Sequence, residues 1–249
     1  MPSVARSNLE RTGSEIRDFY AVHQMVKDMP AVRRKLAVLN KGTIVLLSAV
    51  WEGFCEDLAA EALLLLVDGA PDAAALPTPL QRIVARELKQ SPHELAVWRL
   101  AGDGWRDVLH ARLSYLQKER NRRLNTPKST NINEFFKQAL GIDEMSSNWA
   151  TTQASAKENA SKLDTFIELR NAIAHRGLRD AVVYKTTVKK FNNHIQCLAT
   201  LTESAVEQLV ERSSSLETRN GCEDNARPRP LPDCPNDRDR PEGRHRLTP

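Results

Sequence analysis

The segment that most constrains the fold is LNKGTIVLLSAVWEGFCEDLAAEALLLLVDG, at positions 39–69. It holds too many apolar residues for a helix with one solvent-exposed face, and a helix that is apolar on nearly all sides must be buried. We therefore expect it to form a central helix surrounded by others. Its longest apolar run, IVLLSAVW at 44–51, is far shorter than the about 20 residues that cross a bilayer. We therefore expect no transmembrane segment.

The rest of the 249-residue chain also favours an all-α fold. Hydrophobic residues make up 41% of it and aromatic residues only 5%, a balance more typical of packed helices than of a β-sandwich. No stretch alternates apolar and polar residues as a half-buried strand would. A helix over 4–28 is closed by Pro30, and a second opens near Ala31. Further helices are expected over 80–89, 92–101, 105–124, 132–140 (ended by Gly141), 155–176 and 180–212.

The composition changes near residue 213, which divides the chain into a folded domain, 1–212, and a tail, 213–249. The tail has no aromatic residue, six of the 13 prolines, seven arginines and seven acidic residues. Such a segment cannot bury a core, so we expect it to be disordered. Because its charges cancel, the net charge of +4 belongs to the folded domain. A mildly basic domain is compatible with nucleic-acid binding.

The sequence suggests neither a metal site nor a cofactor. None of the four cysteines forms a CxxC pair, so zinc ribbons and redox motifs are not indicated. No cluster of acidic residues at metal-binding spacing stands beside the motif described next. The N-terminus has no apolar signal core, and we therefore expect a cytoplasmic protein.

One polar group interrupts the apolar pattern of the 155–176 helix, within LRNAIAHRG at 169–177. Asn171 and His175 are four apart and share a face, with Arg170 on its flank. A guanidinium holds a phosphate by a planar fork, and an imidazole exchanges protons near neutral pH. Spacing alone also allows Arg170, His175 and Arg176 to be a solvated helix end favoured by the helix dipole.

Two further groups are candidates for a supporting role. Glu52 and Glu56 lie four apart on the apolar helix, where they could line its polar edge, pair with a base such as Arg170, or support the site. The stretch QKERNRRLNTPK at 117–128 could track phosphates or form a solvated helix end. Its candidate RNA-binding residues are Lys118, Arg120, Arg122, Arg123 and Lys128, with Arg176 added from the motif.

The motif and its flanking segments resemble a known family. LRNAIAHRG resembles the Arg-x4-His motif of the HEPN superfamily of all-α proteins, in which Asn, Asp or His commonly follows the arginine. LSAVWEGFCEDLAAEAL (47–63), LNTPKSTNINEFFKQALGI (124–142) and Trp149 resemble the RiboL-PSP-HEPN family, named for its association with other RNA-processing domains. The resemblance runs from about 39 to 177, most of the folded part.

The resemblance implies an up-and-down helical bundle, here with extra short helices and the tail. It implies a homodimer and a metal-independent endoribonuclease. Because one helix supplies only one Arg and one His, we expect a composite active site across the dimer axis. We expect cleavage by attack of the RNA 2′-hydroxyl. Arg170, Asn171 and His175 would be catalytic. The implied context is a toxin or antiphage defence effector acting on tRNA, mRNA or rRNA, with an antitoxin or regulatory partner. The alternative is a non-catalytic HEPN module that binds RNA or a protein.

One position departs from the pattern of some HEPN toxins. These carry a tyrosine two residues after the histidine, which a partner nucleotidyltransferase modifies. Gly177 occupies that position here. The resemblance therefore does not extend to control by such a partner.

Overall fold

The described part of the chain is helical throughout its regular secondary structure, as the sequence predicts. The structure, a computed structural model, describes residues 3–25, 33–118, 126–176 and 183–214. Its α-helices are α1 (Val4–Met25), α2 (Arg33–Gly69), α3 (Thr78–Lys89), α4 (Gly104–Lys118), α6 (Ser129–Leu140), α7 (Ala156–Arg176) and α8 (Lys185–Ser214). Short 3₁₀ helices are η2 (Ala73–Ala75), η3 (Ala96–Leu100) and η4 (Met145–Asn148).

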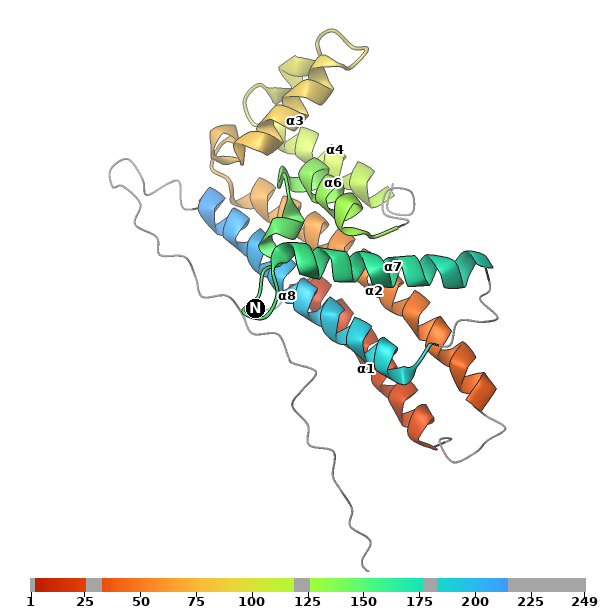
Figure 1. The fold of residues 1–249 in the computed structure, drawn as a ribbon. Coiled ribbons are helices and arrows are strands. Elements are labelled where there is room, and N and C mark those ends of the chain that lie inside the picture. The colour runs from red at the N-terminus through yellow and green to blue at the C-terminus, as the bar shows by residue number, and fades with distance from the viewer. Residues whose placement is uncertain (1–2, 26–32, 119–125, 177–182, 215–249) are drawn as a thin grey trace, which may run out of the picture.

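Helix α2 is the centre of the bundle, which confirms the expectation for the apolar segment. It packs against α1, α4, α6, α7 and α8. Ile44, Trp51, Cys55 and Leu63 of α2 are fully buried. Figure 1 shows α1, α2 and α8 running along one another, with α7 crossing them and α3 lying at the far end. The described residues contain no helix long and apolar enough to cross a membrane.

The structure differs from the sequence prediction after α3. In place of a helix over 92–101 there are turns followed by η3. Ser91 Oγ accepts a hydrogen bond from the backbone N–H of His93, and the N–H of Ala96 bonds to the carbonyl of His93. These short-range bonds favour tight turns over an α-helix. The predicted ends at 26–28, 119–124 and 180–182, and the tail beyond Ser214, lie outside the described residues.

The motif helix α7 starts with a capping box and is anchored by a buried network. Ser155 and Glu158 exchange hydrogen bonds at its N-terminus, which satisfies backbone donors that a helix start leaves unpaired. The amide of Asn159 donates to the carbonyl of Trp149 at 2.8 Å. His194 Nε2 in turn donates to the Asn159 carbonyl at 2.9 Å. These bonds tie α7 to η4 and α8.

A second attachment joins α7 to the start of α6. Asp164 accepts two hydrogen bonds from Ser129, one from its backbone N–H at 2.7 Å and one from its hydroxyl at 2.8 Å. Lys128 forms an ion pair with Glu168 at 2.9 Å, one turn further along α7. The N-terminus of α6 is therefore capped from a neighbouring helix, and α6 is held against the face of α7 that leads to the motif.

Candidate active site

Arg170 and Asn171 lie together, part-buried, near the C-terminal end of α7. Arg170 Nη1 donates a hydrogen bond to Asn171 Oδ1 at 3.0 Å, so the amide sets the direction of the guanidinium. Arg170 Nε is buried and has no hydrogen-bond partner among the described residues. Unused hydrogen-bonding capacity on a buried charged group is costly and asks for an explanation. A group kept for a ligand is one such explanation.

Glu52 of α2 lies within the electrostatic influence of Arg170. Burial of the half-buried carboxyl raises its pKa, and the positive charge of Arg170 acts in the opposite direction. Glu52 is therefore near enough to Arg170 for their charges to interact. A pairing of Glu52 with a base such as Arg170, one of the alternatives left open by the sequence, stays a prediction.

Glu56 lies one turn further along α2, beside buried Cys55. Burial raises the pKa of the Cys55 thiol well above its usual value, and the charges of Glu56 and Glu52 raise it further. The thiol is therefore protonated, and Cys55 is an inert core residue and not a nucleophile.

The remaining motif residues are placed by their backbone alone. His175 and Arg176 form the last turn of α7, and their side chains lie outside the described residues. Residues four apart on a helix share a face, so His175 follows Asn171 on one side of α7. Glu168 and Asp164 occupy that same face one and two turns before Asn171, respectively.

The basic segment is described only at its two ends. Lys118 is the last residue of α4, with a side chain outside the described residues, and Arg120, Arg122 and Arg123 also lie outside them. Lys128 is described, and its ion pair with Glu168 places the end of the segment one turn before Asn171. Lys128, at the end of the basic segment, thus contacts the face of α7 that also carries Asn171.

Sequence reasoning missed the residues that join α6 to α7. Asp164 and Ser129 are 35 residues apart, and nothing local to either one predicts their contact. The face they use is nevertheless readable, because Asp164, Glu168, Asn171 and His175 follow helical spacing. The described residues contain no group of three or more His, Cys, Asp or Glu that could hold a metal ion.

Fold and site together define a class: an all-α bundle around a buried central helix, with an Arg–Asn pair near the end of a crossing helix. The family model of RiboL-PSP-HEPN matches residues 7–209, and the chain therefore belongs to this family. The match covers the chain from α1 to α8 and confirms the resemblance seen in the sequence. Comparisons with curated proteins and with solved structures gave no match.

Proposed function

We propose that this protein is an endoribonuclease that cleaves RNA without a metal ion. The observation that carries the proposal is the Arg170–Asn171 pair, set in the Arg-x4-His motif of a RiboL-PSP-HEPN protein. An amide that orients a guanidinium leaves the remaining N–H groups of the fork for a phosphate. If Arg170 were only part of a solvated helix end, we would expect its Nε to be exposed and no acidic group to lie nearby. Instead its Nε is buried and Glu52 is close enough to interact with its charge.

Each motif residue has a proposed role in transesterification. Arg170 binds the scissile phosphate and stabilises the charge that builds on it in the transition state. The substrate 2′-oxygen attacks phosphorus while the bond from phosphorus to the 5′-oxygen breaks. His175 takes the proton of the 2′-hydroxyl or supplies one to the leaving oxygen. The products are a 2′,3′-cyclic phosphate and a 5′-hydroxyl. Asn171 holds Arg170 in position.

Glu52 is proposed as a positioning residue, with Glu56 further along α2 in a supporting role. The negative charge of a nearby carboxylate favours one placement of Arg170 and limits its movement. Because Glu52 is half-buried, this interaction is less screened by solvent than a surface pair. Glu52→Gln would keep the shape of the side chain and remove the charge.

Lys128 supports a path for RNA along the α6–α7 face. Lys128 forms an ion pair with Glu168, whose side chain is exposed. Exposed ion pairs contribute little to stability. A phosphate could therefore replace Glu168 as the partner of Lys128 at low cost. The other basic residues proposed for this path are Lys118, Arg120, Arg122, Arg123 and Arg176.

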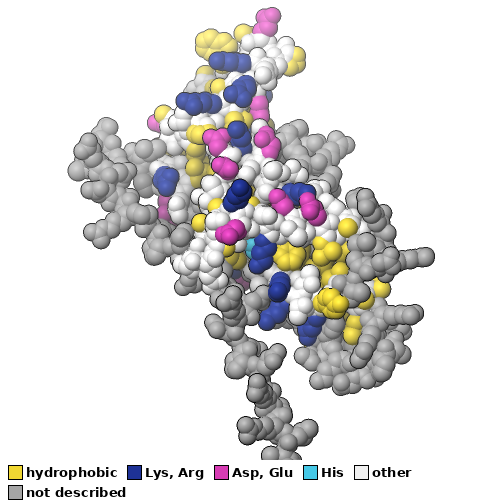
Figure 2. Space-filling model, viewed as in Figure 1, with side chains coloured by type: hydrophobic (Ala, Val, Ile, Leu, Met, Phe, Trp, Pro, Cys, Tyr) yellow, Lys and Arg dark blue, Asp and Glu magenta, His cyan; other side chains and the backbone are white. Residues whose placement is uncertain are grey.

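We also propose a homodimer with a composite active site. One motif helix supplies a single Arg and a single His, whereas a symmetric contact would bring two copies together. Val38 of α2 and Tyr184 are 69% and 65% exposed. A hydrogen bond of 2.6 Å from Asn40 to the carbonyl of Val183 ties the segment that carries Tyr184 to α2. Figure 2 shows hydrophobic side chains gathered between α7 and the start of α8.

The biological role that fits such an enzyme best is a toxin or antiphage effector in the cytoplasm. An RNase that needs neither a metal nor a cofactor would cleave tRNA, mRNA or rRNA whenever no inhibitor is bound to it. Such an activity requires control, and an antitoxin or regulatory protein is the proposed partner.

The test is incubation of the purified protein with total RNA and tRNA in EDTA. We expect cleavage, and we expect Arg170→Ala to lower its rate by about 10²–10³, as loss of a preorganised charge contact does. Arg82→Ala removes an exposed arginine of α3, far along the chain from the motif, and serves as the matched control with unchanged rate. Equal rates for Arg170→Ala and the wild type would reject the proposal. RNA binding without cleavage would instead identify a non-catalytic HEPN module.

A further inference from the structure

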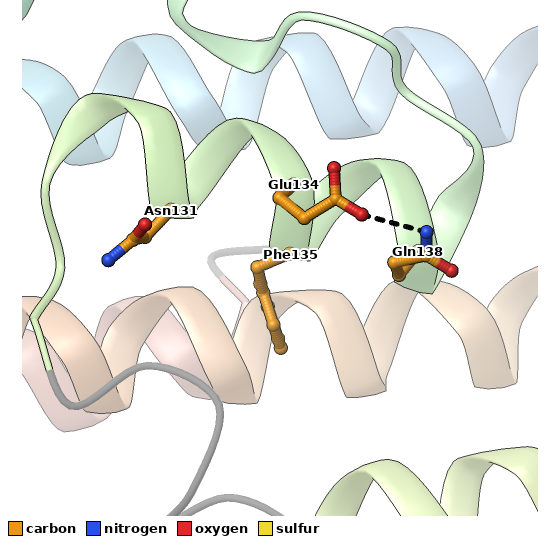
Figure 3. Close-up of a pocket in the computed structure, with 4 residues that line it drawn as sticks. All are labelled: Asn131, Glu134, Phe135 and Gln138. Carbon is orange, nitrogen blue, oxygen red and sulfur yellow. Dashed lines mark hydrogen bonds between the residues drawn. The ribbon is translucent and has the colours of Figure 1, made fainter.

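A cavity on α6 has the chemistry of a nucleobase site. It has a volume of about 350 Å³ and is lined by Asn131, Glu134, Phe135 and Gln138, which share one face of the helix. A volume at the lower end of the range for ligand pockets suits a single small planar group. Figure 3 shows Glu134 and Gln138 side by side, Asn131 near the start of the helix, and the Phe135 ring projecting from it.

The side chains of this cavity are held in place before any ligand binds. Gln138 Nε2 donates to Glu134 Oε1 at 2.8 Å, and Asn131 Nδ2 donates to the carbonyl of Thr126 at 2.7 Å. The Phe135 ring meets Phe136 edge-on, with centroids 5.5 Å apart. Because Phe136 is fully buried, it fixes the ring of Phe135 and leaves it available for stacking.

The unused donor of Gln138 and the unused acceptors of Glu134 suit one base better than the others. After their mutual bond, Gln138 keeps one amide N–H to donate, and the Glu134 carboxylate keeps acceptor sites on both oxygens. The Watson–Crick edge of guanine presents the complementary groups, an acceptor at O6 and donors at N1 and N2. Adenine, cytosine and uracil each place an acceptor against the carboxylate. Unpaired bases in RNA are recognised through such edges together with aromatic stacking.

The cavity lies on the path proposed for RNA. Lys128 immediately precedes α6, and Asn131 lies in the first turn of that helix. Lys128 contacts Glu168 of α7 at 2.9 Å, one turn before Asn171. A single strand could therefore cross from the cavity, past Lys128, to Arg170.

We propose that this cavity binds an unpaired guanine of the RNA substrate, with Glu134 and Gln138 reading its edge and Phe135 stacking on its face. The inference rests on the proposed function, because it assigns base selection to the same enzyme.

The test measures binding apart from cleavage. Fluorescence anisotropy of the full-length protein is recorded with 2′-O-methyl oligonucleotides UUUXUUU, in which X is G, inosine, A, C or U. These probes cannot be cut by 2′-oxygen attack. We expect the probe with X = G to bind most tightly, with an affinity roughly tenfold higher than that of the probe with X = A, as a bidentate base contact allows. Inosine, which lacks the N2 amino group, should fall between them.

Variants assign the effect to residues. Glu134→Gln should abolish the preference for G over UUUUUUU. Phe135→Leu should weaken the binding of the G and A probes alike, by about tenfold, because the stacking contact is lost. Glu144→Gln makes the same change as Glu134→Gln at the start of η4 and should retain the preference.

The outcomes separate this inference from the proposed function. Equal affinities for all five bases, or a preference that survives Glu134→Gln, would overturn the guanine site even if RNA is cleaved in EDTA. A preference for G without cleavage would support the site and reject the catalytic proposal alone. Failure of every probe to bind would overturn the guanine site. The separate cleavage assay in EDTA would then test whether the protein is a ribonuclease.

Discussion

Arg170 shows what could be read from the sequence at the scale of single residues. Its motif and the family resemblance predicted the arginine, the asparagine and the histidine as a group. The hydrogen bond between Arg170 and Asn171 was not predicted, because neighbouring residues on a helix point in different directions. Only the length and flexibility of the arginine side chain allow the contact. The influence of Arg170 on Glu52 was one of several open alternatives, since sequence spacing cannot place α7 against α2.

His194 predicts a residue-scale pH dependence of stability. Burial, with a contribution from the charge of Lys162, lowers the pKa of this core histidine to about 4 from the usual 6.5. Between these values the unfolded chain binds a proton that the folded protein does not, so the free energy of unfolding falls as the pH falls. The contribution is complete above pH 6.5 and is lost progressively down to about pH 4. The loss should be about 3 kcal/mol, at 1.36 kcal/mol per pKa unit.

Urea unfolding at several pH values measures this dependence. His194→Gln keeps a side-chain donor for the carbonyl of Asn159 but does not titrate, so its unfolding free energy should vary less between pH 6.5 and 4. His93→Gln, on the turn before η3, is the matched control and should keep the wild-type slope. The same slope in His194→Gln and the wild type would show that other groups cause the acid sensitivity.

At the scale of elements, the attachment of α6 to α7 can be tested by a matched pair of substitutions. Asp164→Ala removes the acceptor of both bonds from Ser129 and should lower the free energy of unfolding by about 1–3 kcal/mol. Glu168→Gln removes only the exposed ion pair with Lys128 and should cost less than about 1 kcal/mol. Equal effects of both changes on the urea midpoint would contradict the assigned attachment.

The positions of the helices were largely predictable from the sequence. Some of their ends were not, and the two ends of α6 show why. Gly141 was predicted to end its helix, and it does so in a left-handed conformation with φ of 78°. An added Cβ would lie 2.6 Å from the backbone N of Leu80, so the glycine also permits close packing of α3. The start of α6 was predicted three residues late because its cap comes from Asp164 of another helix. Local patterns cannot contain that information.

At the scale of the whole molecule, the composite site predicts complementation between two inactive variants. Protomers with Arg170→Ala and protomers with His175→Ala should each be inactive as homodimers. A mixed dimer retains one Arg170 and one His175, so co-refolded protein should regain measurable RNA cleavage. A two-copy site also predicts that dilution below the dimer dissociation constant abolishes activity. Full activity in a protein that sedimentation shows to be monomeric would contradict the composite site.

The sequence predicted one helical domain for 1–212, whereas α8 also includes Ser213 and Ser214, which the prediction assigned to the tail. The central helix of the domain was predictable because a helix that is apolar on nearly all sides has to be buried. The packing of η4 against α8 was not predictable, since it depends on long-range contacts such as that of Trp149 with Thr202 (2.9 Å). We propose that the tail beyond residue 214 is separate from the domain.

The chemistry of cleavage tests the central proposal most directly. An RNA oligonucleotide that the protein cuts at one position is compared, in EDTA, with the same oligonucleotide carrying a single 2′-deoxynucleotide on the 5′ side of that position. We predict that only the all-ribose substrate is cut and that its products end in a 2′,3′-cyclic phosphate and a 5′-hydroxyl. His175→Ala should lower the single-turnover rate by about 10²–10⁴, the usual contribution of a general acid or base. Cleavage of the deoxy-substituted oligonucleotide at the same bond, or cleavage only after Mg²⁺ is added, would contradict the proposal.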